Sequence, residues 1–185
     1  MKITILSGSP RINSVTKRVA LHLKNWFNVN TKHEIELIEM SDWNLPTVQA
    51  VWSGMEKVPV EFQPLAFNIF SSDAFILVTP EYNGSYSPAM KNLLDHFPKQ
   101  LHKPFGIVTA SPGAMGGMRA SQQLLQLVPA LFGIASPSLL ITPAVDKKFS
   151  PDGDLLDESF QGAVHTFVTE FLWLAEKLAA QKIAA

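Results

Sequence analysis

A cluster of hydroxyl groups with one arginine follows the first apolar run of the sequence. Ser9, Ser14 and Thr16 carry the hydroxyls, Arg11 carries the charge, and Gly8 leaves room for close backbone approach. Phosphates are held by hydroxyl and N–H donors at the start of a helix, and an arginine neutralises their charge. The segment therefore predicts a phosphate site. The alternative, in which Ser14 only caps a helix and Arg11 is a solvated surface charge, explains the residues singly but not their concentration.

The kind of phosphate ligand is narrowed by two glycine patterns that the segment lacks. It contains neither the G-x-G-x-x-G pattern of dinucleotide folds nor the Walker pattern that ends in Gly-Lys-Ser or Gly-Lys-Thr. A mononucleotide bound through its terminal phosphate fits the segment better.

A second polar loop runs from Thr79 to Pro88, after another apolar run. Its Asn83-Gly84 pair can adopt positive φ and aim backbone N–H groups at the polar edge of a flat ring. Tyr82 or Tyr86 can supply an apolar wall. Glu81 is either a ligand contact or a carboxylate that pairs with a cation elsewhere. The alternative is an ordinary turn before a helix, because Asn-Gly is among the commonest turn dipeptides.

A third loop, from Ser111 to Arg119, contains Gly113, Gly116 and Gly117. Three glycines this close together would let the backbone approach the edge of a ligand, although a flexible connection is the simpler interpretation. Arg119 could contact either a nucleotide phosphate or an acidic group on a helix surface.

The elements that position these loops alternate along the chain as short apolar runs and longer helical patterns. Continuously apolar runs are typical of strands covered on both faces in a parallel sheet. The repeated β-α order predicts an open, doubly wound α/β sheet, with ligands at the carboxyl ends of its strands. The expected strands are 3–6, 35–38, 74–78, 105–109 and 139–141, and the expected helices are 14–27, 61–70, 88–97, 117–132 and 157–178.

Two segments do not fit the β-α pattern. Residues 42–59 contain two Trp and two Pro, and residues 142–153 contain Lys147, Lys148, Pro151 and the turn Asp152-Gly153. Both segments are predicted to be irregular loops. Surface connection is the simpler interpretation, and a cover for a ligand or a partner subunit is the alternative.

Composition excludes several classes of function. The 185 residues suit one domain spanning 1–185, and a net charge of -1 gives no basic field for nucleic acid. Without cysteine there is no disulfide, thiol nucleophile or Cys-ligated metal, so redox chemistry requires a bound cofactor. No signal peptide and no apolar run of roughly 18 residues is present, which predicts a cytoplasmic protein outside the membrane. No HExxH-like spacing or G-x-S-x-G elbow occurs, so neither a metal site nor a serine hydrolase is predicted.

Two motifs together resemble the NAD(P)H-dependent FMN reductase family, which includes quinone, azo-dye and chromate reductases. The first is Gly8-Ser9-Pro10-Arg11 followed by Ser14, and the second is Pro80-Glu81-Tyr82-Asn83-Gly84-Ser85 with Lys91-Asn92-Leu93-Leu94-Asp95. Neither motif would suffice alone. Their joint occurrence at this separation is specific, and the resemblance covers nearly the whole chain.

This resemblance implies a flavodoxin-like three-layer sandwich whose five-stranded parallel sheet has the order 2-1-3-4-5. It implies FMN as cofactor, NADPH or NADH as co-substrate, and a small-molecule electron acceptor such as a quinone, azo dye, free flavin or metal oxyanion. Hydride transfer is intrinsic to the two cofactors, so no catalytic residue is predicted. The cofactor-binding residues implied are Ser9, Pro10, Arg11, Ser14, Val15, Thr16, Pro80, Glu81, Tyr82, Asn83, Gly84, Ser111 and Gly113.

The resemblance also implies a homodimer or homotetramer with the flavin pocket at the subunit interface. The apolar residues expected to build such an interface, unless they are needed in the core, are Leu93, Leu94, Phe97, Leu127, Val128, Leu131 and Phe132. The chain departs from the family's usual pattern at Thr16, often Asn, at Ser87-Pro88, usually Pro-Gly, and at His96, often Trp. The last two departures concern the acceptor side of the pocket.

Two other classes of protein are considered beside the enzyme. A flavodoxin-like electron carrier would not itself oxidise NAD(P)H, and such carriers tend to be strongly acidic, unlike this chain. A flavin-binding sensor or a relative without cofactor is disfavoured by the intact Ser9, Arg11 and Ser14.

Overall fold

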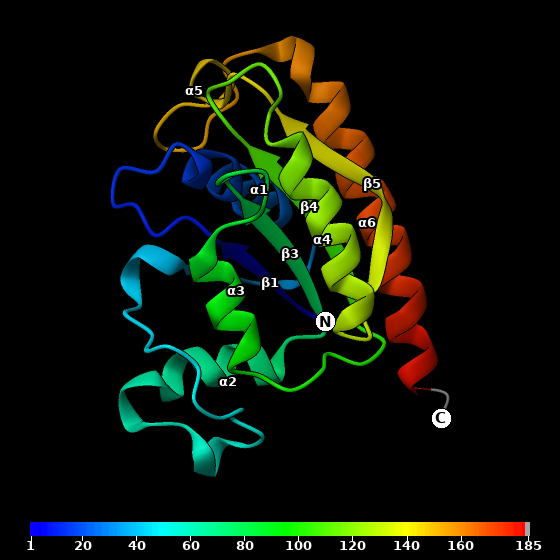
Figure 1. Ribbon diagram of the computed structural model, residues 1–185. Helices are drawn as coiled ribbons and strands as arrows, with labels where there is room; N and C mark the ends of the chain where they lie inside the picture. Colours follow the sequence, from blue (N-terminus) through cyan, green and yellow to red (C-terminus); the bar gives the residue numbers. More distant parts are fainter. Residues whose placement is uncertain (184–185) are drawn as a thin grey trace.

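The fold is built on one parallel sheet with the strand order β2-β1-β3-β4-β5 (Figure 1). The structure, a computed structural model, describes residues 1–183. The strand order confirms the order predicted from the sequence. The strands are β1 (Lys2–Ser7), β2 (Glu34–Glu39), β3 (Ala74–Thr79), β4 (Pro104–Ala110) and β5 (Ile134–Thr142).

Helices cover both faces of the sheet and complete three layers (Figure 1). On one face, Val19, Leu23 and Phe171 pack against Ile5 and Ile76 of the central strands. On the other face, a second apolar cluster is built by side chains of α2, α3 and α4. The helices are α1 (Thr16–Asn30), α2 (Gln63–Ser71), α3 (Pro88–Asp95), α4 (Met118–Ala130), α5 (Val145–Lys148) and α6 (Gln161–Ile183).

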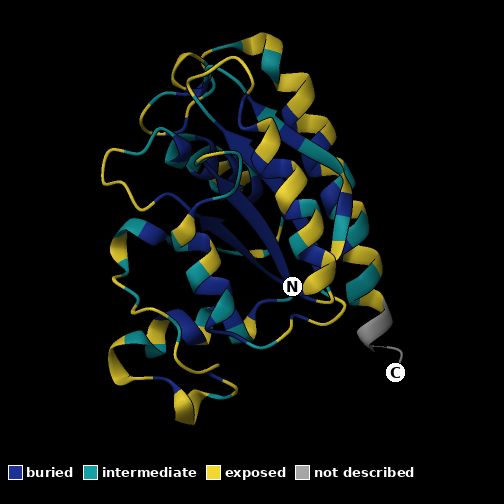
Figure 2. Ribbon diagram, viewed as in Figure 1, coloured by how far each residue is buried: buried dark blue, intermediate teal, exposed yellow. Residues whose placement is uncertain are grey.

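Burial explains why the central strands were recognisable as continuous apolar runs. All residues of β1, β3 and β4 are buried, whereas β2 and β5 at the sheet edges are partly exposed (Figure 2). A strand covered on both faces has no solvent side on which a polar residue would be favoured. The three polar loops follow directly after these buried strands, at their carboxyl ends.

Some predicted boundaries were wrong. Strand β5 runs over nine residues, well beyond the expected 139–141, because Pro137 can stand in an edge strand that needs no hydrogen bond from it. Helix α1 starts at Thr16, so Ser14 is not its N-cap; Val15 holds that position. The short helix α5 lies inside the segment 142–153 that was predicted to be irregular.

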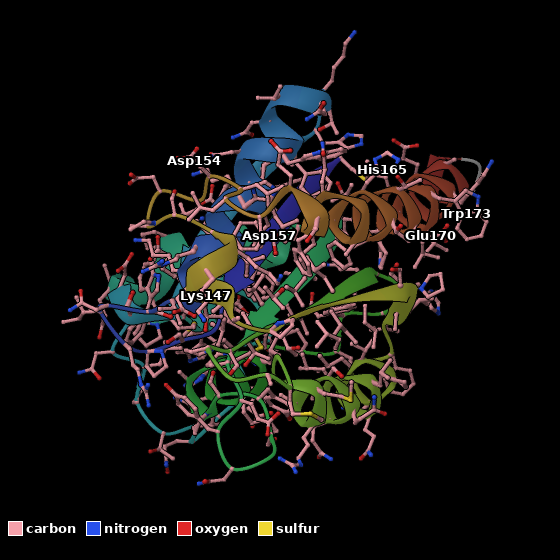
Figure 3. All side chains as sticks on the ribbon, turned by 90° about the horizontal axis from the view of Figure 1, so that it is seen from above. Lys147, Asp154, Asp157, His165, Glu170 and Trp173 are labelled. Atoms are coloured by element: carbon pink, nitrogen blue, oxygen red, sulfur yellow. The ribbon has the colours of Figure 1, made fainter. Side chains whose placement is uncertain are left out.

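The segment after β5 is held against α1 and its own neighbours. The Nδ1 atom of His22 is 2.9 Å from the carbonyl oxygen of Gly153, and Lys148 pairs with Asp157 at 2.7 Å. Figure 3 shows Asp157 in this segment and Trp173 farther along α6. These contacts account for the ordered path of a segment with little regular structure.

The segment 42–59 is anchored at the end of α3. The backbone N–H of Trp52 donates to the carbonyl of His96 at 2.7 Å, and the Trp52 ring stacks on Phe62 with centroids 5.5 Å apart. The side-chain amide of Asn92 donates to the carbonyl of Pro46 at 2.8 Å. The segment is thus packed as a surface connection with one buried tryptophan.

No helix within residues 1–183 has the length and apolar character needed to cross a membrane.

Candidate functional site

The first two polar loops meet at the carboxyl ends of β1 and β3. These strands are neighbours, with Ser7 opposite Val78, and the Gly8 N–H donates to the Val78 carbonyl at 2.8 Å. The Ser87 hydroxyl donates to the Gly8 carbonyl, and the Ser87 N–H donates to Thr79 Oγ1 at 3.0 Å. Since these bonds fix the first loop to the second, the predicted convergence of the two loops is confirmed.

Gly8 is needed because helix α3 approaches it closely. A Cβ atom at this position would lie 2.5 Å from Cε and 3.1 Å from Cβ of Met90, and 3.2 Å from the Val78 carbonyl oxygen. The sequence predicted that Gly8 leaves room for a ligand to approach the backbone. The structure shows that the protein's own side chain and backbone occupy it.

An open cavity of about 280 Å³ lies between the loops, and we name it the Ser9 cavity. The Ser9 and Thr16 side chains are buried in its wall, and Ser14 is half-buried. The N–H of Arg11 reaches Ser9 Oγ at 3.4 Å, and the N–H of Thr16 reaches Ser14 Oγ at 3.2 Å. Its lining residues are Ser9, Arg11, Asn13, Ser14, Val15, Thr16, Pro80, Glu81, Tyr82, Ala110, Ser111 and Pro112.

The start of α1 is open to an anion. Its N-cap residue, Val15, has no side-chain acceptor, and the first turn contains no acidic residue. The partial positive charge of a helix start favours a negative ligand there, although the N–H groups of Thr16 and Arg18 already have partners in Ser14 and Val15. The geometry of this segment therefore suits the phosphate predicted from its sequence.

The second loop forms a tight two-residue hairpin. Asn83 has φ 52° and Gly84 has φ 81°, which confirms that this pair adopts positive φ. Tyr82 and Ser85 exchange backbone hydrogen bonds of 2.9 and 3.1 Å. Positive φ at both central residues is typical of the turn type that Asn-Gly favours.

Arg11 joins the first loop to this hairpin. Its guanidinium carbon is 5.0 Å from the centroid of the Tyr82 ring, within the range of a cation–π contact. The Arg11 side chain is exposed, so the contact leaves its N–H donors accessible. Arg11 can therefore neutralise an anion at the loops without leaving Tyr82.

The third loop is tied to the second by an ion pair. Glu81 Oε2 accepts the N–H of Arg119 at 3.1 Å, and Glu81 Oε1 lies 3.5 Å from the guanidinium. The Glu81 side chain is 17% exposed, whereas that of Arg119 is 73% exposed, so solvent reaches the guanidinium more than the carboxylate. In this structure Glu81 pairs with a cation and Arg119 contacts a carboxylate, which is one of the two roles considered for each residue.

The glycines of the third loop serve the fold. Gly116 and Gly117 have φ of 59° and 84°, and their added Cβ atoms would lie 2.6 Å from the Pro143 nitrogen and 2.9 Å from Cβ of Thr109. They let the loop pack on the ends of β4 and β5. At these two positions protein atoms fill the side on which a Cβ would stand, so packing alone accounts for the glycines.

Not all of the predicted residues line the Ser9 cavity. Pro10, Asn83, Gly84 and Gly113 do not, although Asn83 lines a neighbouring cavity. Gly113 uses its N–H and carbonyl within the third loop. Sequence reasoning missed three lining residues, namely Asn13, Ala110 and Pro112, although they lie next to residues that it did select.

The neighbouring cavity, which we name the Lys91 cavity, has a volume of about 670 Å³. It shares Arg11, Glu81 and Tyr82 with the Ser9 cavity, so the two adjoin. Burial raises the pKa of the Tyr86 phenol in its wall above the ordinary value. Its lining residues are Arg11, Glu81, Tyr82, Asn83, Ser85, Tyr86, Pro88 and Lys91.

The apolar residues expected at a subunit interface lie mainly in the core. The buried ones are Leu93, Leu94, Phe97, Val128 and Leu131. Because these side chains are already buried within the single chain, core packing accounts for them; helical periodicity alone marks an apolar face without saying what covers it. Of this set, Phe132 is exposed and Leu127 is half-buried.

Comparison with known proteins identifies close similarity in sequence. The sequence model of the family described as NADPH-dependent FMN reductase matches residues 1–145. An FMN-dependent NADPH-azoreductase of Staphylococcus aureus is 32% identical over 183 residues, covering 93% of this chain and 94% of that protein.

Solved structures share the fold. FerB, a flavoenzyme NAD(P)H:(acceptor) oxidoreductase from Paracoccus denitrificans, superposes with a TM-score of 0.77 at 23% identity, covering 95% of this chain and 97% of that one. A mutant flavodoxin from Pseudomonas aeruginosa gives a TM-score of 0.55 at 20% identity, covering 98% of this chain and 99% of that one. The fold is therefore flavodoxin-like. With the family match over residues 1–145 and the azoreductase similarity over nearly the whole length, this chain belongs to the NADPH-dependent FMN reductase family.

Proposed function

We propose that this protein is an oxidoreductase that passes electrons from NAD(P)H through FMN to a small-molecule acceptor such as a quinone, azo dye, free flavin or metal oxyanion. Family membership supplies the cofactor and the electron donor. The observation that carries the proposal is the Ser9 cavity, where the predicted phosphate loop adjoins the hairpin loop and Ser111.

The Ser9 cavity fits the phosphate of FMN. Ser9, Ser14 and Thr16 offer hydroxyl groups, and the start of α1 offers its partial positive charge with no acidic residue in the first turn. Arg11 supplies the positive charge that a phosphate needs as it loses water. The cavity is lined by donors of the kinds that a phosphate requires.

Among the described residues that line this cavity, Glu81 is the one acidic residue, and it is held in an ion pair. Glu81 would repel a phosphate if its carboxylate were free, but it accepts the N–H of Arg119 and pairs with the guanidinium. The same pair holds the second loop against the start of α4. We propose that Glu81 orients the second loop through its pair with Arg119 and forms part of the cavity wall that contacts FMN.

The flavin ring is proposed to lie against the segment from Pro80 to Gly84, with Ser111 nearby. When bound, FMN would supply the capacity to accept a hydride and to pass electrons onward. The residues of this chain are proposed to bind the phosphate and to orient the ring. None of them is required to act as an acid or a base in hydride transfer.

The alternative of a pure electron carrier is less well supported. The net charge of -1 gives no strongly acidic surface for docking to protein partners. The relative from Staphylococcus aureus is named an azoreductase, and this similarity favours a small-molecule acceptor for the present chain. A homodimer or homotetramer that works in the cytoplasm completes the proposal, and light scattering after size-exclusion chromatography would measure its size.

The test uses the purified chain loaded with FMN and kept free of oxygen. NADPH and NADH are added separately while flavin absorbance is recorded, and then a panel of quinones, azo dyes and metal oxyanions is supplied. We expect bleaching by at least one nucleotide and recovery of the absorbance with an acceptor. A flavin that stays oxidised with both nucleotides would favour the carrier and overturn the enzyme.

A further inference from the structure

We propose that the Lys91 cavity binds the anionic group of a charged aromatic substrate and so makes the enzyme prefer anionic substrates to neutral ones. The inference rests on the proposed function, because it concerns the substrate of the same site. The shared chemistry is a sulfonate or phosphate carried by a molecule with a flat ring. Either the electron acceptor or the nucleotide donor could carry that group.

The position of the cavity fits a substrate. The Ser9 and Lys91 cavities have Arg11, Glu81 and Tyr82 in common, and Asn83 of the hairpin lines only the second. A molecule in the Lys91 cavity would therefore contact the same hairpin against which the flavin ring is proposed to lie. Electrons pass between rings that stack or adjoin, so this juxtaposition places a substrate within reach of the flavin.

The walls of the cavity provide two aromatic rings. Tyr82 comes from the hairpin and Tyr86 from the residues just before α3. Within the part of the chain that the structure describes, the Tyr86 hydroxyl makes no hydrogen bond. A tyrosine phenol keeps its proton at neutral pH, so the Tyr86 hydroxyl is a hydrogen-bond donor. A protonated phenol beside an anion forms a charge-assisted hydrogen bond.

The charges that line the cavity are positive on balance. Arg11 and Lys91 carry positive charge, and Glu81 is the acidic residue in the wall. Glu81 is already paired with Arg119, which does not line the cavity. Lys91 also pairs with Asp95, one helical turn along α3, but its side chain remains 46% exposed and can turn toward a ligand. Lys91 and Glu81 are each held in an ion pair, so an anion here would compete with Asp95 for Lys91 and would share Arg11 with the Ser9 cavity.

The experiment compares Lys91→Met with Lys91→Arg, which keeps the charge, and with Lys99→Met, which removes a lysine that lines neither cavity. One arm measures kcat/KM for a neutral azobenzene dye and for its sulfonated analogue, with NADPH fixed. The second arm measures kcat/KM for NADPH and for NADH, with the acceptor fixed. Flavin content and thermal unfolding of each variant establish that it is folded and loaded.

We expect Lys91→Met to lower the sulfonated-to-neutral ratio, or the NADPH-to-NADH ratio, by about threefold, as for a partly exposed ion pair. Lys91→Arg and Lys99→Met should keep the ratio of the wild type. Tyr86→Phe should lower the same ratio, because it removes the hydrogen bond and leaves the ring. The arm that responds identifies the substrate that carries the anion.

Two results would overturn the inference in distinguishable ways. If the wild type is reduced by NAD(P)H but Lys91→Met changes neither ratio, the proposed function stands and the anion subsite does not exist. If neither nucleotide reduces the flavin of the wild type, the proposed function fails and the inference fails with it.

Discussion

Replacing Gly8 by alanine tests whether the junction of β1, β3 and α3 positions the phosphate loop. The new Cβ would lie 2.5 Å from Cε and 3.1 Å from Cβ of Met90, and 3.2 Å from the Val78 carbonyl oxygen. The Met90 methyl group can rotate away, but its Cβ and the Val78 carbonyl belong to a buried helix and a central strand. The first loop must therefore move instead.

The size of the effect follows from these contacts. Adding a methyl group to a well-packed site costs about 1–3 kcal/mol, so the free energy of unfolding should fall by that amount in Gly8→Ala. The hydrogen bonds from Gly8 N–H to Val78 and from Ser87 to Gly8 O would lengthen as the loop shifts. We expect FMN affinity to fall about tenfold, which corresponds to about 1.4 kcal/mol.

Urea unfolding of the apoprotein and fluorescence titration with FMN measure the two effects separately. The matched control is Gly162→Ala in α6, where an added Cβ meets no atom within 4 Å. This control should leave FMN affinity unchanged and stabilise the protein by up to about 0.5 kcal/mol, because alanine favours helix more than glycine. If Gly8→Ala matched the control in both measurements, the proposed junction would be refuted.

Three further predictions concern charge. Arg11→Met should weaken FMN binding about tenfold through the lost phosphate contact while leaving riboflavin binding unchanged, as titration of both flavins would show. Burial lowers the pKa of His22, so the unfolded chain binds its proton first. The free energy of unfolding should therefore fall as pH decreases below about 6.5, and less so in His22→Asn, as measured by urea unfolding across pH. Hydrogen bonds from Lys148 and Ser159 lower the pKa of Asp157, which contributes stability above its unfolded pKa of about 4. Acid titration of unfolding should show that stability being lost as pH falls through the folded pKa, with a smaller loss in Asp157→Asn.

The fold could be predicted because the central strands carry their own signal. A run such as Ala74 to Val78 is apolar at every position, and only a strand covered on both faces explains that pattern. Once the strands alternate with helices, their carboxyl ends must share one edge, and the loops after β1 and β3 must meet. The edge strand β5 was underestimated because Ser136 and Pro137 interrupt its apolar run.

The contacts within the site could not be predicted in the same way. Glu81 and Arg119 are 38 residues apart in the chain, and only the fold brings the carboxylate to the start of α4. The need for glycine at positions 8, 116 and 117 likewise comes from atoms distant in sequence. Turn chemistry was predictable at Asn83-Gly84, since positive φ there depends on the two residues themselves.

The apolar faces of α3 and α4 show a second limit. Leu93 on α3 and Val128 on α4 belong to apolar helix faces, and such a face is predicted to be buried without a statement of what buries it. In this chain the faces are buried in one apolar cluster formed by the sheet and the helices α2, α3 and α4. Phe132, which follows the end of α4, remains the exposed member of that set.

Anaerobic titration of the FMN-loaded protein with NADPH tests the central claim most directly. We expect that FMN copurifies or rebinds, that Arg11→Met weakens this binding, and that NADPH bleaches the flavin absorbance of the wild type. A protein that binds riboflavin as tightly as FMN, or whose flavin remains oxidised with both NADPH and NADH, would contradict it.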